Sequence, residues 1–141
     1  MYQSILVPLD GSVTAEAILP EIENLAKGMG ARVILTRVCP SIKVSEPMVT
    51  EALTSTSEHA EQYLAEMKYA LNGKGIDAET HLCYGDAAYE IIDLGNRLNA
   101  GLIAMSTHGR SGIGRWLLGS IAEKVVRHSS RPVLLVRAKE A

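Results

Sequence analysis

Short apolar runs alternate along the chain with longer segments in which apolar residues recur at helical spacing. Four almost wholly apolar runs predict buried strands, at residues 5–8, 33–38, 102–105 and 132–137. A fifth segment, residues 76–83, is more polar and alternates in places, which predicts a strand at the edge of a sheet. The run at 102–105 has no polar interruption, so we expect it to be a central strand.

Helices are predicted between these strands. After the first strand, Ser12 is a candidate N-cap of a helix that Gly28 and Gly30 would stop. The apolar stripe of this helix is formed by Ile18, Ile22, Leu25 and Met29. Pro20 lies inside the stripe and is expected to kink the helix or delay its regular part. Further helices are expected over about 53–71 and 88–98, and residues 41–50 are expected to form a loop.

This alternation predicts the fold class. Five strands alternating with helices through right-handed crossovers form an α/β fold, a single doubly wound five-stranded parallel sheet with helices on both faces. A chain of 141 residues suits one domain and is too short for two ordinary ones, so one domain is expected over residues 1–141. The last strand is apolar although we expect it at a sheet edge, and such edges tend to pair with another chain. A homodimer is therefore predicted through Val133, Leu134, Leu135 and Val136.

Composition and charge exclude several classes of function. The 14 basic and 16 acidic side chains give a formal net charge of -2, so no nucleic acid is expected as a partner. No run approaches the roughly 20 apolar residues that span a bilayer, so no membrane insertion is expected. Cys39 and Cys83 form no CxxC pair and are expected to be buried residues in a reducing, cytoplasmic compartment. His59, His81 and His128 lack the spacing of metal ligands, so no metal site built by the protein is predicted.

Candidate ligand-binding residues follow the predicted strands. In open α/β sheets, ligands bind outside the carboxyl ends of the strands, where the strand order reverses. The residues expected just past these ends include Asp10, Val38, Gly85 and Ser106. The loop after the fourth strand is rich in glycine, which lets a phosphate approach the backbone closely. Its glycines are Gly109, Gly112, Gly114 and Gly119.

The segment after this loop has the pattern of a helix start. Ser120 and Glu123 are spaced as a capping box, which predicts a helix from Ser120 to about His128. The first amides of such a helix are unpaired donors at the positive end of the helix dipole, and they attract anions. The sequence therefore predicts a phosphate site at this helix start.

The spacing in this region resembles the ATP-binding motif of the universal stress proteins, a UspA-like family. That motif reads Gly, two residues, Gly, nine residues, Gly, and then Ser or Thr. Gly109, Gly119 and Ser120 match its second part, whereas Ser106 stands where the first glycine belongs. The resemblance extends over essentially the whole chain, through residues 7–12, 84–86, 110–112, 117–120, 123–125 and 132–136.

The resemblance implies a Rossmann-like, adenine nucleotide alpha-hydrolase-like fold and a protein that binds ATP and regulates the stress response. The nucleotide-binding residues that it implies are Pro8, Asp10, Val38, Met105, Ser106, Gly109, Arg110, Gly119, Ser120 and Ile121. Asp10 and the backbone of Val38 would contact the ribose and adenine. The phosphates would be held by Gly109, Gly119, Ser120 and the amide of Ile121, with the charge of Arg110 beside them. Any Mg²⁺ or Mn²⁺ would come with the triphosphate. Because Ser106 brings a Cβ where the motif has none, weakened rather than lost binding is expected.

Other interpretations of these residues stay open. Asp10 could simply cap a turn, and the glycines could belong to a flexible surface loop. Ser106, His108 and Asp10 invite comparison with a hydrolase triad, but the GxSxG pattern is absent and no catalytic residue is predicted. A Rossmann dehydrogenase is disfavoured, because the first strand is not followed by GxGxxG.

Two other functions compete with nucleotide-dependent regulation. One is a weak ATPase or phosphotransferase that uses the same site, although no Walker lysine follows the glycines and no base is placed to activate water. The other is a dimeric interaction module without nucleotide, which the departure at Ser106 supports.

Overall fold

Strands and helices alternate along the chain as the apolar pattern predicts. The structure is a computed structural model that describes residues 3–40, 47–107 and 118–137, with side chains from residue 56 onward in the second range. The strands are β1 (Ser4–Pro8), β2 (Arg32–Cys39), β3 (Ala78–Tyr84), β4 (Leu102–Thr107) and β5 (Val133–Arg137). The helices are α1 (Val13–Glu16), α2 (Leu19–Met29), α3 (Pro47–Gly73), α4 (Ala87–Arg97) and α5 (Ser120–His128).

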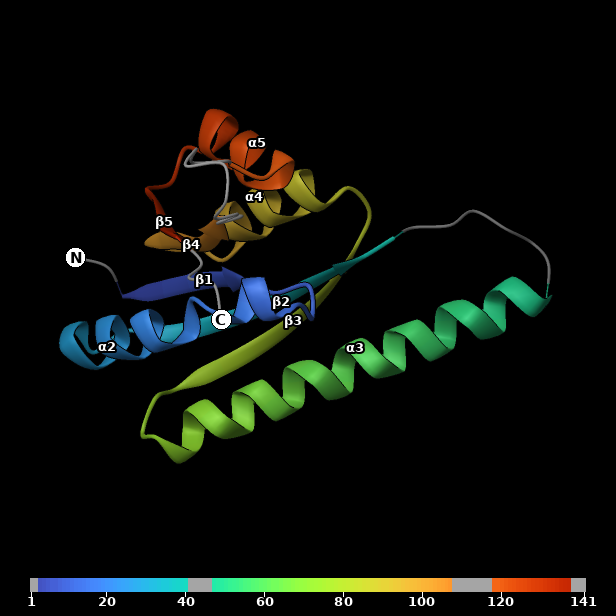
Figure 1. Cartoon of the computed structure of the whole chain (residues 1–141), viewed down its shortest axis with the longest axis horizontal. Helices are drawn as coiled ribbons and strands as arrows, with labels where there is room; N and C mark the ends of the chain where they lie inside the picture. The colour runs from blue at the N-terminus through green and yellow to red at the C-terminus, as the bar shows by residue number, and fades with distance from the viewer. Residues whose placement is uncertain (1–2, 41–46, 108–117, 138–141) are drawn as a thin grey trace, which may run out of the picture.

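The strands form one parallel sheet with helices on both faces. The strand order is β3-β2-β1-β4-β5, and every neighbouring pair is parallel. Helices α2 and α3 cover one face, and α4 and α5 cover the other (Figure 1). The predicted doubly wound α/β fold is therefore confirmed.

Each face of the sheet buries its own apolar core. Ile22 of α2 and Val7 of β1 belong to one core, and both side chains are fully buried. Leu94 of α4 and Leu6 of β1 belong to the other. Because successive side chains of a strand point to opposite faces, neighbouring residues of β1 serve different cores. This two-sided burial is the reason that β1 is apolar without alternation.

The segment after β1 forms two helices rather than one. α1 is a short helix whose N-cap, Ser12, accepts a hydrogen bond of 3.0 Å from the amide of Ala15. Pro20 lies in the first turn of α2, where its missing amide costs no helical hydrogen bond. The proline therefore delays the regular helix and does not kink a continuous one. α2 ends at Met29, and its C-cap is Gly30, whose φ of 64° lies in the left-handed region.

The prediction of a loop over residues 41–50 is wrong for its last part. α3 begins at Pro47, and residues 41–46 lie outside the described ranges. A proline in the first position of a helix has a suitable φ and needs no amide donor. Proline can thus begin a helix as well as break one. The sequence pattern around Pro47 does not distinguish a loop proline from a proline that starts a helix.

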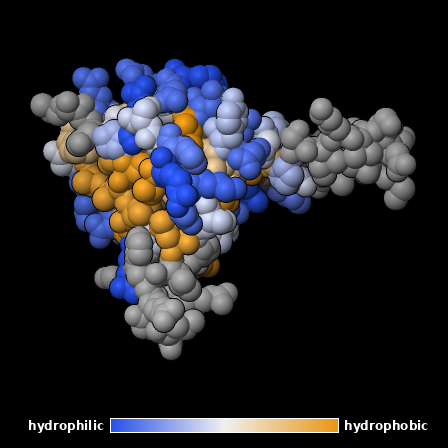
Figure 2. Space-filling view, turned by 90° about the horizontal axis from the view of Figure 1, so that it is seen from above, coloured by the Kyte–Doolittle hydropathy of each residue, from blue (hydrophilic) through white to orange (hydrophobic). Residues whose placement is uncertain are grey.

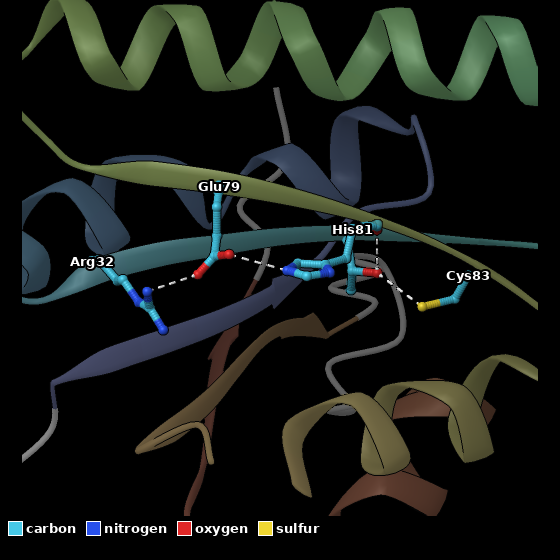
Figure 3. Close-up of polar contacts among 5 residues, drawn as sticks. Arg32, Glu79, His81 and Cys83 are labelled. Carbon is cyan, nitrogen blue, oxygen red and sulfur yellow. Dashed lines mark hydrogen bonds and ion pairs between the residues drawn. The ribbon is translucent and has the colours of Figure 1, made fainter. Parts of the chain in front are cut away.

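β3 lies at one edge of the sheet, as its polar composition predicts, and it begins at Ala78 rather than at residue 76. On the face turned away from α3, Glu79 lies between Arg32 and His81 (Figure 3). Its carboxylate is 3.2 Å from Arg32 Nη1 and 3.1 Å from His81 Nε2, and all these side chains are partly exposed. Exposed pairs of this kind contribute only about 0–1 kcal/mol each. This polar row therefore keeps the edge strand solvated and is not needed to hold the sheet together.

The prediction that residues 102–105 form a central strand is only partly correct. β1 is the middle strand, and β4 lies between β1 and β5. β4 is nevertheless paired along both of its edges and has a core on each face, which accounts for its apolar sequence.

β5 forms the second edge of the sheet. Its apolar side chains are half-buried; they are Val133, Leu134, Leu135 and Val136. Apolar side chains gather in a patch on the face seen from above in Figure 2, the side of the molecule that carries α4, α5 and β5 in Figure 1. The homodimer through this strand stays a prediction.

Gly28 and Gly30 offer a matched test of the end of α2. A Cβ on either would meet nothing within 4 Å, but only Gly30 has a positive φ, 64°. We expect Gly28→Ala to raise the free energy of unfolding by about 0.5–1 kcal/mol, because alanine favours helix over glycine. Gly30→Ala should lower it by about 1 kcal/mol, because the left-handed backbone strains an L side chain. Urea denaturation measures both, and an unchanged or more stable Gly30→Ala protein would contradict this account of the helix end.

Candidate functional site

The candidate site is a cleft that opens where β1 and β4 separate. β1 pairs with β2 from Ser4 to Pro8, but its register with β4 comprises only Ile5 and Leu6. β2 and β3 extend the sheet on one side of β1, whereas β4 and β5 extend it on the other. The strand order therefore reverses between β1 and β4, and open α/β sheets bind ligands at such a reversal.

The cleft is lined by β1, β4 and the first turns of three helices. Its lining residues are Pro8, Leu9, Asp10, Ser12, Thr14, Ala15, Ala87, Ile91, Met105, Ser106, Gly119, Ser120, Ile121 and Ala122. Small and apolar side chains predominate, together with several hydroxyl groups and, among the described residues, the single carboxylate of Asp10. A mostly apolar lining with a few polar groups is typical of small-molecule sites.

The turn after β1 places Asp10 at the rim of the cleft. Asp10 Oδ1 accepts a hydrogen bond of 2.8 Å from the amide of Ser12. Gly11, between them, has a φ of 87°, which favours glycine. Asp10 thus does cap a turn, which is the structural role that the sequence left open. Its side chain nevertheless stays exposed and lines the cleft, so the structural role does not exclude contact with a ligand.

The N-terminus of α5 presents amides to the cleft. Its N-cap is Gly119 rather than Ser120, and no side chain caps it, so the predicted capping box is wrong although the helix bounds are correct. The first helical hydrogen bond runs from the amide of Glu123 to the carbonyl of Gly119 at 2.9 Å. The amides of Ser120, Ile121 and Ala122 therefore precede the helical ladder and have no acceptor within it.

The other helices that begin at the cleft are capped by their own side chains. Ser12 Oγ accepts from the amide of Ala15 in α1, and Asp86 Oδ2 accepts from the amide of Tyr89 in α4, each at 3.0 Å. α5 has no such cap. Among the helix starts that the structure describes at this cleft, α5 is therefore the one at which no cap side chain accepts from any of the first amides, which leaves all of them to another acceptor, such as water or an anion.

Ser106 joins two sides of the cleft. It lies inside β4, which continues to Thr107, so its predicted position past the strand is wrong. Its hydroxyl donates a hydrogen bond of 3.3 Å to the carbonyl of Ala15 in α1. Both residues line the cleft, so this contact ties β4 to α1. The Cβ of Ser106 also occupies space that a glycine would leave open.

The structure brings most of the predicted site residues to the cleft. Those that line it are Pro8, Asp10, Met105, Ser106, Gly119, Ser120 and Ile121. Val38, whose backbone was expected to contact the ligand, lies inside β2 rather than after it, and its side chain packs against the core beneath α4. Gly109 and Arg110, together with His108, lie outside the described residues. Binding of a nucleotide by these residues stays a prediction.

Several lining residues were not predicted from the sequence. They are Leu9, Ser12, Thr14, Ala15, Ala87, Ile91 and Ala122. Most belong to the first turns of α1, α4 and α5 or to the turns before them. A signal for these exists, because a helix that follows the carboxyl end of a strand starts at the ligand-binding edge of the sheet. Ile91 carries no such signal, since its sequence pattern is that of an ordinary core residue.

Other chemistry is limited in the described part of the chain. No group of three or more His, Cys, Asp or Glu side chains within it could hold a metal ion. Cys39 and Cys83 are free and buried, as predicted. Burial raises the pKa of the Cys39 thiol despite the opposing charge of Arg37, which disfavours a reactive thiolate. No helix among the same residues is long and apolar enough to cross a membrane.

The chain matches known proteins over nearly its whole length. Residues 1–137 match the model of the Universal stress protein family. Universal stress protein MJ0531 of Methanocaldococcus jannaschii is 33% identical over 145 residues, which cover 97% of this chain and 83% of that protein.

Solved structures share the fold. The hypothetical protein MJ0577 superposes with a TM-score of 0.86 at 30% sequence identity, over 100% of this chain and 99% of that one. A universal stress protein solved in complex with cAMP superposes with a TM-score of 0.77 at 22% identity, over 98% of this chain and 99% of that one. With the family match over residues 1–137 and the 33% identity to the Methanocaldococcus jannaschii relative, the chain belongs to the universal stress protein family.

Proposed function

We propose that this chain binds ATP in the cleft between β1 and β4 and acts as a nucleotide-dependent regulator of the stress response. The observation that carries the proposal is the uncapped N-terminus of α5, which shares the cleft with the carboxylate of Asp10. Amides that have no acceptor in the helix and no capping side chain lie in the same cleft as an anionic acceptor. A ligand with phosphates at one end and hydroxyl groups at the other suits this arrangement.

At the phosphate end, the amides of Ser120 and Ile121 would donate to phosphate oxygens. The helix dipole adds the equivalent of roughly half a positive charge at the same place. Gly119 at the N-cap allows close approach, because glycine has no side chain to keep a phosphate from the backbone. Gly109 and Arg110 are proposed to complete this end of the site.

At the nucleoside end, an ionised Asp10 offers only acceptors and would therefore suit the hydroxyls of the ribose. Pro8 and Met105 add apolar surface to the lining, and the backbone of Val38 is proposed to meet the adenine. Mg²⁺ or Mn²⁺ would arrive with the triphosphate, because these ions are usually held by phosphate oxygens and water together with one or two carboxylates.

The relative solved in complex with cAMP supports the class of ligand. That protein shares the fold of this chain, and its ligand is an adenine nucleotide. ATP, rather than another adenine nucleotide, is proposed because Gly109, Gly119 and Ser120 match the ATP-binding motif.

Gly119→Val tests the phosphate end. The backbone of Gly119, with φ of -63° and ψ of 153°, is one that valine adopts readily, so the variant adds bulk without backbone strain. We expect it to lose at least about tenfold in affinity for ATP. At about 100 times its Kd, ATP should stabilise the wild-type protein by about 2.7 kcal/mol and raise its Tm by several degrees. Calorimetric titration and thermal melts measure both effects. Gly28→Val, near the opposite ends of the strands, should bind as wild type.

Mass spectrometry of the ligand released from purified, denatured protein identifies the nucleotide directly. Recovery of ATP supports the proposal. Repeated recovery of empty protein, with no rise in Tm on adding ATP, indicates the interaction module without nucleotide instead. Hydrolysis of labelled ATP well above the Gly119→Val background indicates the weak ATPase or phosphotransferase.

Ser106→Gly tests the departure from the family motif. Loss of the Cβ opens the cleft where β4 meets α1, so we expect ATP to bind about three- to tenfold more tightly. Ser106→Ala keeps the Cβ and loses only the hydroxyl bond to Ala15, so its affinity should stay near that of wild type. Titration of both variants separates bulk from hydrogen bonding. A weaker complex in Ser106→Gly would mean that the serine helps to bind the ligand.

We further propose that two chains associate through β5, as its half-buried apolar edge suggests. Light scattering should then report twice the 15.2 kDa mass of one chain. A monomer at working concentrations would contradict this association and leave the nucleotide proposal untouched.

A further inference from the structure

Arg37 lies against the back of the turn that carries Asp10. It belongs to the end of β2, the strand next to β1, and its side chain is half-buried. A Cβ built on Gly11 would lie 3.2 Å from Arg37 Nη1 and 3.5 Å from Arg37 Cζ, so the guanidinium packs directly beside the Gly11 backbone. Asp10 and Ser12 line the cleft, whereas Gly11 and Arg37 do not. The turn therefore borders the cleft through Asp10 and Ser12 and contacts the guanidinium through Gly11.

Tyr63 of α3 also contacts the Arg37 side chain. Arg37 Cζ lies 5.4 Å from the centre of the Tyr63 ring, within the distance of a cation–π contact. The Tyr63 hydroxyl donates a hydrogen bond of 2.8 Å to Glu16 Oε2 at the end of α1. Burial, this hydrogen bond and the charges of Glu16 and Asp10 raise the pKa of Tyr63 and outweigh the opposing charge of Arg37. The phenol therefore stays protonated and remains the donor.

Glu16, Arg37 and Tyr63 form a bracket that joins α1, β2 and α3 around the turn at residues 10–12. Ser12 of this turn is bonded to Asp10 through its amide and to α1 through its hydroxyl and carbonyl, whereas Gly11 is exposed and has a positive φ. Glycine has more conformational freedom than any other residue. The Arg37 guanidinium packs on this glycine and also contacts Tyr63. It therefore limits the conformations that the turn can adopt.

We propose that Arg37 is a positioning residue: packed against both Tyr63 and Gly11, it fixes the turn at residues 10–12 and with it the direction of the Asp10 carboxylate. The consequence for ligand binding rests on the proposed nucleotide function. Asp10 is proposed to meet the ribose, so a loosened turn weakens the hold on the nucleoside and leaves the phosphate contacts at α5 unchanged.

Four variants test this role. Arg37→Met keeps an unbranched side chain and removes the charged planar group. Arg37→Lys replaces it if the Arg37→Met protein does not fold. Tyr63→Phe keeps the ring against the guanidinium and loses the bond to Glu16. Arg97→Met is the matched control, because Arg97 is an exposed arginine whose ion pair with Asp93, at 2.8 Å, lies on α4 and outside the cleft.

Calorimetric titration with ATP and with adenosine is the first measurement. We expect Arg37→Met to weaken both ligands by a similar factor of about ten, the loss that accompanies one weakened hydrogen bond to a charged group. Tyr63→Phe should lose less, and Arg97→Met should bind as wild type. Gly119→Val, by contrast, should weaken ATP far more than adenosine. If Arg37→Met lowers Tm but leaves both affinities unchanged, Arg37 is only structural and the proposal is overturned.

Amide hydrogen exchange of Ser12 in the nucleotide-free protein is a second measurement, independent of the proposed function. The Ser12 amide is bonded to Asp10 in the fixed turn, so it should exchange faster in Arg37→Met, while the amide of Leu6 in the core keeps its rate. If the wild-type protein binds neither ATP nor adenosine, the proposed function fails. The exchange rate of the Ser12 amide in Arg37→Met still tests the role of Arg37. Faster exchange supports it, and an unchanged rate overturns it.

Discussion

The parting of β1 and β4 is the constraint on which the site depends. β1 and β2 share a full ladder over Ser4–Pro8, so their backbone groups satisfy one another. β1 and β4 share a register only at Ile5 and Leu6, and beyond it the chain enters α1 on one face of the sheet and α5 on the other. The gap is therefore bordered by turns and helix starts, whose backbone polar groups need other partners. The candidate site arises here because strand pairing stops.

The helix starts around this gap differ in whether a side chain caps them, and the stability of the fold alone does not require this difference. α1 and α4 begin with side-chain oxygens that accept from their own first turns, whereas α5 begins with Gly119 and has no such acceptor. Glycine at an N-cap costs only a few tenths of a kcal/mol relative to the best capping residues. A small loss of stability thus leaves amides open to an anion, and the missing side chain gives that anion room. The bracket behind Asp10 complements this from the other rim, because it packs against the turn that carries Asp10.

Local patterns in the sequence predicted the elements well, because strands and helices depend on residues a few positions apart. Ser12 caps α1 and Gly30 ends α2 where the pattern indicates, since both effects act within one turn. The same reasoning failed where one residue type serves two purposes. Pro47 begins a helix instead of extending a loop, and Ser120 follows the N-cap instead of forming it.

By itself the sequence determined the fold class and the family resemblance, because both depend on the spacing of residues along the chain. The tertiary structure alone decided which residues meet. Ser106 contacts Ala15 from 91 positions away, and Arg37 of β2 packs on Gly11 and on Tyr63 of α3. No local pattern encodes such pairs, since they depend on the order in which strands join the sheet and on how side chains pack between its layers. The lining of the cleft and the support of Asp10 therefore exist only once the strands are assembled.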